Sequence, residues 1–255
     1  MSLSPKKHLG QHFLKELHYA QRIVDLVPSE PHLPVIEIGP GEGVLTGMLI
    51  ERLGHLSAIE IDTDAVQHLG ARFSKDQLTI VFTDVLRWNP RETLSGPAHF
   101  VGNLPYNISS PIFFHLLENR DLMASGVFML QKEVAERICA GPGSKTFGIL
   151  SVLIGAYFDR EYCVTVPPGA FRPPPKVQSG VIRLTPTAHP PQIEFSQLKA
   201  FVKQAFSQRR KTLRNSLKGF PVVGISDDDP RWAMRAEQLS IADFVQMAGG
   251  TCDSP

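Results

Sequence analysis

The stretch Val35-Ile-Glu-Ile-Gly-Pro-Gly-Glu-Gly43 decides the fold that this sequence predicts. Residues 34–39 predict a short buried strand, and the glycines that follow permit a sharp turn. Backbone N–H groups in such a turn can come close to a ligand. A glycine-rich turn after the first strand of a doubly wound sheet is a cofactor site by geometry, because it lies at the carboxyl edge of the strands.

Short apolar runs alternate with helical patterns on both sides of this stretch. Further strands are expected at 55–61, 78–82, 98–102 and 126–131, and helices at 41–53, 63–73, 108–117, 132–140 and 147–156. Residues 158–166 and 177–184 alternate apolar with polar side chains, as a closing antiparallel pair does. The alternation predicts an α/β fold with a doubly wound, mostly parallel, Rossmann-like sheet.

The composition changes at Thr185-Pro-Thr-Ala-His-Pro-Pro-Gln192, where proline ends regular structure and indicates a linker. Beyond it only helical patterns follow, at 195–206, 211–217, 231–239 and 241–247. We therefore expect a Rossmann-like domain over 1–188 and a small all-helical C-terminal domain over 189–255.

Composition excludes several classes of protein. The 255 residues are 42% hydrophobic and 20% charged, which is typical of a globular chain. The longest apolar run, 147–158, is too short to cross a bilayer, and the N-terminus has no secretory or transit pattern. Three dispersed cysteines and no Cys/His ligand spacing favour neither a disulfide framework nor a metal site. We expect a reduced, cytoplasmic setting without membrane contact.

Three strand ends carry groups that suit one cofactor. The turn contributes Gly39 and Gly41, the second strand ends at Glu60 and the third is followed by Asp84. The spacing GxGxG does not satisfy the dinucleotide fingerprint, whereas a carboxylate at Glu60 can accept from ribose hydroxyls and one at Asp84 from an exocyclic amine. This set suits S-adenosyl-L-methionine (SAM); the alternative is a structural turn with surface acids.

The fourth strand ends in Asn103-Leu-Pro-Tyr106, at the same edge. The exocyclic amine of adenine is a poor nucleophile, because its lone pair is delocalised into the ring. If the Asn103 side-chain oxygen and the Leu104 carbonyl accept its two N–H bonds, the lone pair is freed for methyl transfer. Pro105 stiffens the turn and Tyr106 offers a face for a flipped base. The alternative is an ordinary turn with a buried tyrosine.

Further along, Phe171 precedes a rigid proline-rich stretch, Arg172-Pro-Pro-Pro-Lys176. Phe171 is the candidate for the opposite face of the base. The alternative is a surface loop with Phe171 in the core.

Segments in a fixed order resemble the KsgA/RsmA-type family of ribosomal RNA adenine dimethyltransferases and span nearly the whole chain. They are LGQHFL (9–14), EIGPGEGVLT (37–46), EID (60–62), DVL (84–86), NLPYNISSPI (103–112), FRPPPKVQSGVIRL (171–184), FSQRRKTLRNSL (206–217) and RAEQLSIADF (235–244). The resemblance implies SAM-dependent N6,N6-dimethylation of two adjacent adenosines in the 3′-terminal hairpin of 16S rRNA, with S-adenosyl-L-homocysteine as product.

The resemblance also implies cofactor contacts at His12, Leu14, Gly39, Glu60, Asp84 and Asn103, and Gly41 and Val85 in the same segments complete the predicted cofactor site. One position departs from the family pattern: His12 stands where the family often has asparagine. An imidazole can still donate a hydrogen bond there.

The net charge of +1 conceals two basic segments. Residues 1–15 hold Lys6, Lys7 and Lys15 without an acid, and residues 195–220 hold seven basic residues without an acid. Clustered basic residues suit phosphate contacts, although a solvated helix face is the usual meaning of such a run. The candidate RNA-binding residues are Lys199, Lys203, Arg209, Arg210, Lys211, Arg214 and Lys218.

The sequence therefore predicts a monomeric enzyme that acts on 16S rRNA within the small (30S) subunit or its precursor. Three alternatives stay open: a large-subunit rRNA adenine methyltransferase of the antibiotic-resistance type, a non-catalytic RNA-binding assembly or transcription factor on the same fold, and a DNA adenine methyltransferase. The intact Asn103–Tyr106 motif argues against a non-catalytic factor, and the lack of an obvious DNA-reading domain weakens the last.

Overall fold

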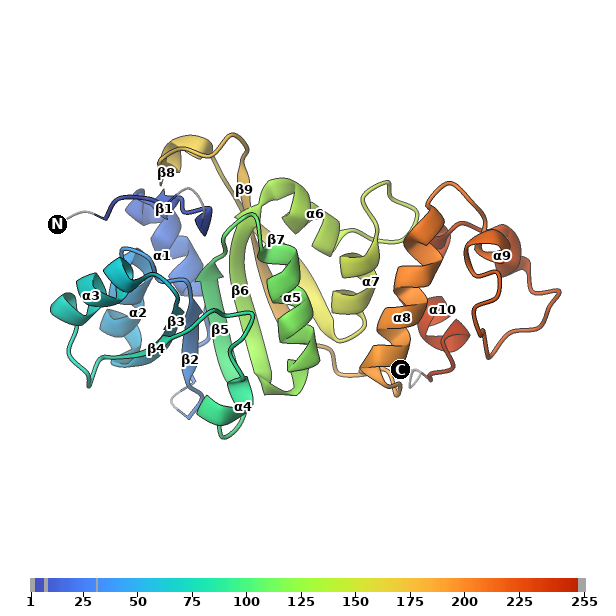
Figure 1. The fold of residues 1–255 in the computed structure, drawn as a ribbon, viewed down its shortest axis with the longest axis horizontal. Coiled ribbons are helices and arrows are strands. Elements are labelled where there is room, and N and C mark those ends of the chain that lie inside the picture. Colours follow the sequence, from blue (N-terminus) through green and yellow to red (C-terminus); the bar gives the residue numbers. More distant parts are fainter. Residues whose placement is uncertain (1–2, 7–8, 31, 252–255) are drawn as a thin grey trace. The chain divides into compact units, whose positions relative to one another are not determined.

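The structure is a computed structural model that describes residues 3–6, 9–30 and 32–251. Its contacts divide the chain into two compact units (Figure 1). The first unit comprises the chain up to Ala135 together with Glu161–Thr185, and the second comprises Glu136–Arg160 together with the chain from Pro186 onward.

A sheet with the strand order β4-β3-β2-β5-β6-β9-β7 forms the frame of the fold. Strands β2 to β6 run parallel to their neighbours, and β9 runs antiparallel to β6. This arrangement confirms the predicted doubly wound α/β fold with a closing antiparallel element. The bounds are β2 (Val35–Ile38), β3 (Leu56–Glu60), β4 (Leu78–Phe82), β5 (Ala98–Asn103), β6 (Met123–Gln131), β7 (Phe158–Val166) and β9 (Ser179–Pro186).

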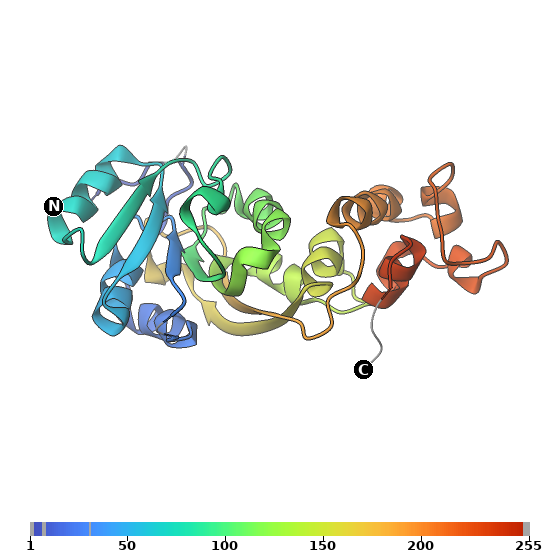
Figure 2. The same cartoon turned by 90° about the horizontal axis from the view of Figure 1, so that it is seen from below.

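Helices cover both faces of this sheet (Figures 1 and 2). On one face α1 and α2 bury Ile23 and Leu49 against strand residues such as Val101. On the other face α5 packs Phe113 edge-on against Phe128 of β6, with ring centroids 5.4 Å apart. The bounds are α1 (Leu17–Leu26), α2 (Val44–Leu53), α3 (Thr63–Arg72), α4 (Pro90–Thr93), α5 (Ser109–Glu118) and η2 (Arg120–Leu122).

A second, two-stranded sheet joins distant parts of the first unit. β1 (Phe13–Leu14) pairs antiparallel with β8 (Phe171–Arg172), which follows η3 (Pro168–Ala170), and the register sets Leu14 opposite Phe171. This pairing attaches the N-terminal segment to the body of the unit. The sequence does not predict it, because two residues per strand are too few for a periodic pattern.

The second unit is built from helices around an aromatic core. Phe201 of α8 meets Phe244 of α10 edge-on, and Phe206 stacks on Phe244 at 5.6 Å between centroids. The bounds are α6 (Lys132–Cys139), which begins in the first unit, α7 (Ile149–Gly155), α8 (Phe195–Ala205), η4 (Phe206–Gln208), α9 (Leu213–Ser216), η5 (Pro230–Ala233), η6 (Ala236–Gln238) and α10 (Ile241–Met247).

The predicted boundary between 188 and 189 differs from this division. Residues 136–160 group with the C-terminal helices, because α7 packs against α8 and α10. The second unit is therefore larger than the segment 189–255.

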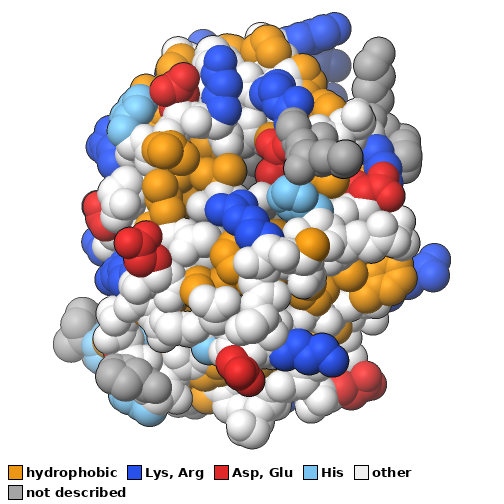
Figure 3. Space-filling model, turned by 90° about the vertical axis from the view of Figure 1, so that its left-hand side faces the viewer, with side chains coloured by type: hydrophobic (Ala, Val, Ile, Leu, Met, Phe, Trp, Pro, Cys, Tyr) orange, Lys and Arg blue, Asp and Glu red, His pale blue; other side chains and the backbone are white. Residues whose placement is uncertain are grey.

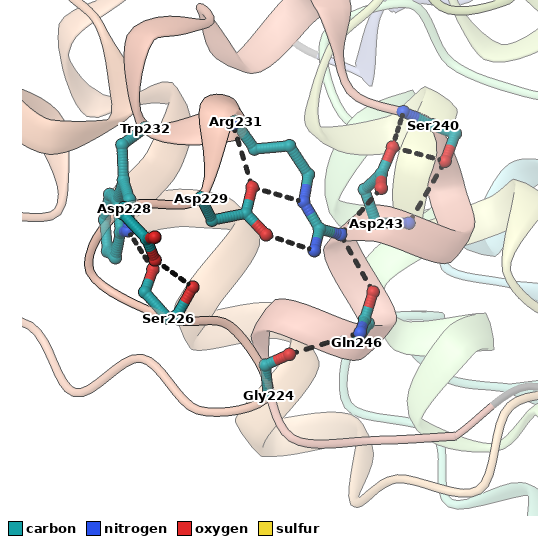
Figure 4. A network of polar contacts seen from close by, with 9 residues as sticks. All are labelled: Gly224, Ser226, Asp228, Asp229, Arg231, Trp232, Ser240, Asp243 and Gln246. Carbon is teal, nitrogen blue, oxygen red and sulfur yellow. Dashed lines mark hydrogen bonds and ion pairs between the residues drawn. The ribbon is translucent and has the colours of Figure 1, made fainter.

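The helix predicted at 231–239 is wrong. Two 3-10 turns, η5 and η6, lie there, because the Met234 carbonyl accepts from Leu213 N–H at 2.8 Å and Met234 itself is extended. A polar network holds this irregular segment to α10 (Figure 4). Arg231 donates to Asp229, Asp243 and Gln246, and the guanidinium lowers the pKa of Asp229 to about 2.

Among the described residues, no helix is long and apolar enough to cross a membrane.

Gly102 of β5 lies close to the backbone of β2, and this close approach provides a test of the fold. A Cβ on Gly102 of β5 would lie 2.6 Å from the Ile38 carbonyl oxygen of β2, and backbone cannot yield as a flexible side chain can. Gly102→Ala should lower the free energy of unfolding by roughly 1–3 kcal/mol in urea titrations followed by circular dichroism. Gly70→Ala is the control, since Gly70 lies in α3 with open space around it and should gain about 0.5–1 kcal/mol. Equal stability of the two variants would contradict the strand geometry.

Candidate functional site

A cavity of about 260 Å³ opens at the carboxyl ends of β2, β3, β4 and β5, within the first unit. It lies where the strand order reverses between β2 and β5, which is the position of ligand sites in doubly wound sheets. The sequence-predicted residues that line it are His12, Leu14, Gly39, Gly41, Glu60, Asp84, Val85, Asn103, Leu104, Pro105 and Tyr106. The fold thus brings together all the predicted catalytic and cofactor positions except one, Phe171.

The glycine turn owes its shape to left-handed backbone. Gly39 and Gly41 have φ of 68° and 53°, a region that side chains disfavour. A Cβ on Gly41 would lie 2.9 Å from Phe13 Cε1, so glycine also makes room for the N-terminal segment. The turn leads into α2 with its backbone along the cavity, as the sequence predicts.

Glu60 ends β3 with its carboxylate buried and anchored. Oε1 accepts from the N–H groups of Ile61 and Asp62 at 2.8 Å, and Oε2 accepts from Gly41 N–H at 3.2 Å. Burial raises the pKa of Glu60, and these backbone donors oppose that shift. The carboxylate is therefore a fixed acceptor on the cavity wall.

Asp84 follows β4 and begins the turn that carries Val85. Its Oδ1 accepts from Leu86 N–H at 2.9 Å, which fixes the side chain at the wall. Val85 is buried beside it and offers an apolar surface. Together they provide one polar and one apolar contact for a planar ring.

Hydrogen bonds to three different segments position the Asn103–Tyr106 motif. Leu104 N–H donates to Met129 O of β6 at 2.9 Å, and Asn103 Nδ2 donates to the His12 carbonyl at 2.9 Å. The Tyr106 hydroxyl is hydrogen-bonded to Ser179 Oγ of β9, and burial raises the pKa of Tyr106. Because Nδ2 is committed to His12, the Asn103 amide is oriented with Oδ1 left to accept.

His12 takes part through both its backbone and its ring. The carbonyl orients Asn103, while the imidazole stacks on Tyr106 at 5.4 Å between centroids. Ring Nδ1 lies 2.8 Å from the carbonyl oxygen of Pro173. The residue that departs from the family pattern thus still reaches the motif.

Phe171 does not reach the cavity. Its side chain is 2% exposed and belongs to the hydrophobic core between the sheet and α1. The pairing of β8 with β1 sets it opposite Leu14 and buries it. The predicted stacking role is therefore not supported by the structure, and the alternative of a core residue is what the structure shows.

Ion pairs hold the N-terminal segment along the cavity. The Lys6 ammonium lies 2.5 Å from Asp62 and 2.8 Å from Asp64, and Gln11 donates to Asp62 at 2.9 Å. Arg172 pairs with Glu42 at 2.7 Å and so ties β8 to the glycine turn. The sequence analysis includes Lys6 among the basic residues that suit phosphate contacts, but in the structure its ammonium pairs with Asp62 and Asp64. Lys7 lies outside the described residues.

Glu37 is a site residue that the sequence analysis misses. It lines the cavity but is 1% exposed, and Thr46 Oγ1 donates to its carboxylate at 2.6 Å. Burial raises its pKa to about 7, with a smaller opposing effect of the Thr46 bond. The sequence does contain a signal for this residue: Glu37 is an acid within the apolar run Val35–Ile38, where burying a charge is costly.

The predicted RNA-binding residues all belong to the second unit, and none of them lines the cavity. Arg214 stacks its guanidinium over Trp232 at 5.5 Å, and Lys199 lies over the Phe195 ring at 5.7 Å. The other five predicted residues are exposed: Lys203, Arg209, Arg210, Lys211 and Lys218. On the face of the first unit in Figure 3, by contrast, Lys and Arg side chains are interspersed with acidic and hydrophobic ones.

Within the described ranges, no group of three or more His, Cys, Asp or Glu side chains is arranged to hold a metal ion.

Comparisons with known proteins agree on the kind of protein. A family model described as ribosomal RNA adenine dimethylase matches residues 3–249. Proteins named ribosomal RNA small subunit methyltransferase A are 46% identical in Bacteroides thetaiotaomicron and 45% identical in Xanthomonas campestris. These alignments cover 96% and 97% of this chain, and 93% and 96% of the relatives.

Two solved structures share the fold over nearly the whole chain. A dimethyladenosine transferase from Plasmodium falciparum matches with a TM-score of 0.77 at 23% identity, over 92% of this chain and 96% of that one. The 23S rRNA methyltransferase ErmE matches with a TM-score of 0.68 at 26% identity, over 92% and 98% of the two chains.

The raised pKa of Glu37 predicts a pH-dependent stability. Its folded value of about 7 lies above the ordinary 4.5, so its contribution is full below pH 4.5 and is lost as the pH rises through 7. Glu37→Gln cannot titrate, and between pH 5 and 8.5 the wild type should lose up to about 3 kcal/mol of unfolding free energy relative to it. Urea titrations across this range measure the difference. Parallel pH profiles would show that the Glu37 carboxyl ionises normally.

Proposed function

This chain belongs to the ribosomal RNA adenine dimethylase family, and from that premise we propose how the residues around its cavity perform the reaction. The activity is SAM-dependent N6,N6-dimethylation of adenosine in 16S rRNA. The observation that carries our proposal is the bond from Asn103 Nδ2 to the His12 carbonyl, since it presents Oδ1 as an acceptor. We further propose that the targets are two adjacent adenosines in the 3′-terminal hairpin.

The cavity fits SAM by the chemistry of its donors and acceptors. Gly39 and Gly41 bring backbone close without a Cβ, and the anchored carboxylate of Glu60 can accept from ribose hydroxyls. Asp84 can accept from the adenine amine and Val85 can contact the ring, while His12 and Leu14 close the wall from the N-terminal segment. When bound, SAM supplies an electrophilic methyl group on a cationic sulfur.

Asn103 and Leu104 prepare the nucleophile in this proposal. The Asn103 Oδ1 and the Leu104 carbonyl accept the two N–H bonds of the target amine, so that its nitrogen lone pair leaves conjugation with the ring. Pro105 fixes the backbone between the motif's ends, and Tyr106 stacks on the extruded base. The methylated amine is acidic and loses its proton to solvent or a nearby carbonyl, so no strong base is required.

A second transfer to the same nitrogen places a further demand on the site. After one methylation the amine retains a single N–H, and one of the two acceptors then faces a methyl group instead. Leu104 lines the cavity with a closely packed apolar side chain that is 1% exposed, so the wall beside the acceptors is apolar. We propose that this apolar wall accommodates the first methyl group while Asn103 keeps the remaining N–H.

The RNA partner and assembly state extend the proposal. We propose that the chain acts as a monomer in the cytoplasm on 16S rRNA within the 30S subunit or its precursor. The cavity brings together all the predicted catalytic and cofactor residues except Phe171, so the proposed site is complete without residues of a second copy. Exposed basic residues of the second unit, Arg209, Arg210, Lys211 and Lys218 among them, would contact phosphates.

The large-subunit alternative is less well supported. The sequence identity to ErmE is 26%, whereas the identity to relatives named for the small subunit reaches 46% over nearly all of this chain. Intact Asn103 and Tyr106 in a formed cavity also disfavour a purely non-catalytic factor.

Removing the Asn103 amide tests the central role. Asn103→Ala should reduce kcat for methyl transfer to unmethylated small subunits by at least about 100-fold, the effect of losing one preorganised polar contact in a transition state. SAM affinity by calorimetry should stay largely intact, because the glycine turn, Glu60 and Asp84 remain. Asn89→Ala, which removes only the exposed cap of α4, is the control. Substantial residual activity would refute the amine-orienting role.

Two substitutions separate the contribution of the Tyr106 ring to methyl transfer from that of its hydroxyl. Tyr106→Phe keeps the stacking face but loses the bond to Ser179, so it should raise KM for RNA by only a few fold; Tyr106→Ala should lose roughly 10-fold to 100-fold in kcat/KM, from about 1–3 kcal/mol of stacking. Steady-state kinetics with labelled SAM measure both. If the phenylalanine and alanine variants lose activity equally, the ring is not the stacking platform.

A further inference from the structure

The connection between α6 and α7 has no part in the function described so far. Its sequence is Gly141-Pro-Gly-Ser-Lys-Thr146, and all but Ser144 are exposed. It lies entirely within the second unit, as do the basic residues of the segment 206–217. We refer to residues 141–146 as the glycine loop.

The glycine loop has a defined shape. Gly143 is left-handed with φ of 82°, and its N–H donates to the Glu237 carbonyl at 2.7 Å. Ser144 Oγ accepts from Phe147 N–H at 3.1 Å and lies 3.1 Å from the Thr146 hydroxyl. A loop ordered in this way loses little conformational entropy when it binds a partner.

Two contacts hold the glycine loop to the basic segment 206–217, about 60 residues further along the chain. Phe147, at the end of the loop, is fully buried and meets Phe206 edge-on at 6.3 Å between centroids. Arg209 Nη2 donates to the Lys145 carbonyl at 3.0 Å. The loop and Arg209 therefore form one continuous surface.

This surface gathers positive charge. Lys145, Arg209, Arg210 and Lys211 are all exposed, and in the described part of the chain none of them pairs with a carboxylate. The acid beside this surface is Glu237, whose backbone carbonyl accepts from Gly143 N–H. Its side-chain Oε2 atom is buried. Like charges held together on one surface repel, and an anionic partner relieves that repulsion.

We propose that the glycine loop and residues 209–211 form a single binding surface for the phosphate backbone of structured rRNA, in which Lys145 makes a phosphate contact. The inference rests on the proposed function, since it extends the RNA interface of that enzyme. The small side chains of the loop allow close approach of a bulky RNA helix, and the bond from Arg209 keeps the Lys145 backbone in register with the other cations.

The salt dependence of RNA binding tests this inference. Binding of unmethylated small subunits is measured between 50 and 200 mM KCl for wild type, Lys145→Gln, Lys145→Arg and the control Lys75→Gln, an exposed lysine of the first unit. One lost phosphate contact should lower the slope of log K against log salt by about 0.9, so that the fold-loss of affinity over this range shrinks about threefold. Lys145→Arg should retain the wild-type slope, and Lys75→Gln should too.

A wild-type slope and affinity for Lys145→Gln would overturn the inference. SAM affinity and the circular-dichroism spectrum should be unchanged in Lys145→Gln, which shows that the variant is folded. The failure of the proposed function would look different: wild type itself would then not methylate the subunits at any salt concentration.

Discussion

The hydrogen bond from Asn103 Nδ2 to the His12 carbonyl is the contact on which the site depends. It joins the end of β5 to the N-terminal segment, which is itself held by the pairing of β1 with β8 and by the ion pairs of Lys6. An amide has one donor end and one acceptor end, so engaging the donor determines where the acceptor is available. The catalytic proposal follows from this single orientation.

Much of the cavity could be predicted from sequence because its parts are local. The glycine turn, Glu60, Asp84 and Asn103 each follow a strand with a clear apolar pattern, and parallel strands bring their carboxyl ends to one edge. Helix α1 could have been predicted in the same way, since Ala20, Ile23, Val24 and Val27 are buried at helical spacing.

The remaining features depend on contacts between distant segments. Phe171 is turned into the core by the register of β8 against β1, and Lys6 is neutralised by acids about 56 residues away. The helix expected at 231–239 fails because Leu213 captures the Met234 carbonyl. None of these partners is visible in a local pattern, and each one changes the role that composition suggests for the residue.

The most direct test of the account is a crystal structure of the chain with S-adenosyl-L-homocysteine and an RNA hairpin that carries the target adenosine. The account predicts that the adenine N6 lies about 2.7–3.2 Å from both Asn103 Oδ1 and the Leu104 carbonyl oxygen, with the ring on Tyr106. An adenine whose N6 faces Asn103 Nδ2, or lies beyond hydrogen-bond reach of Oδ1, would contradict it.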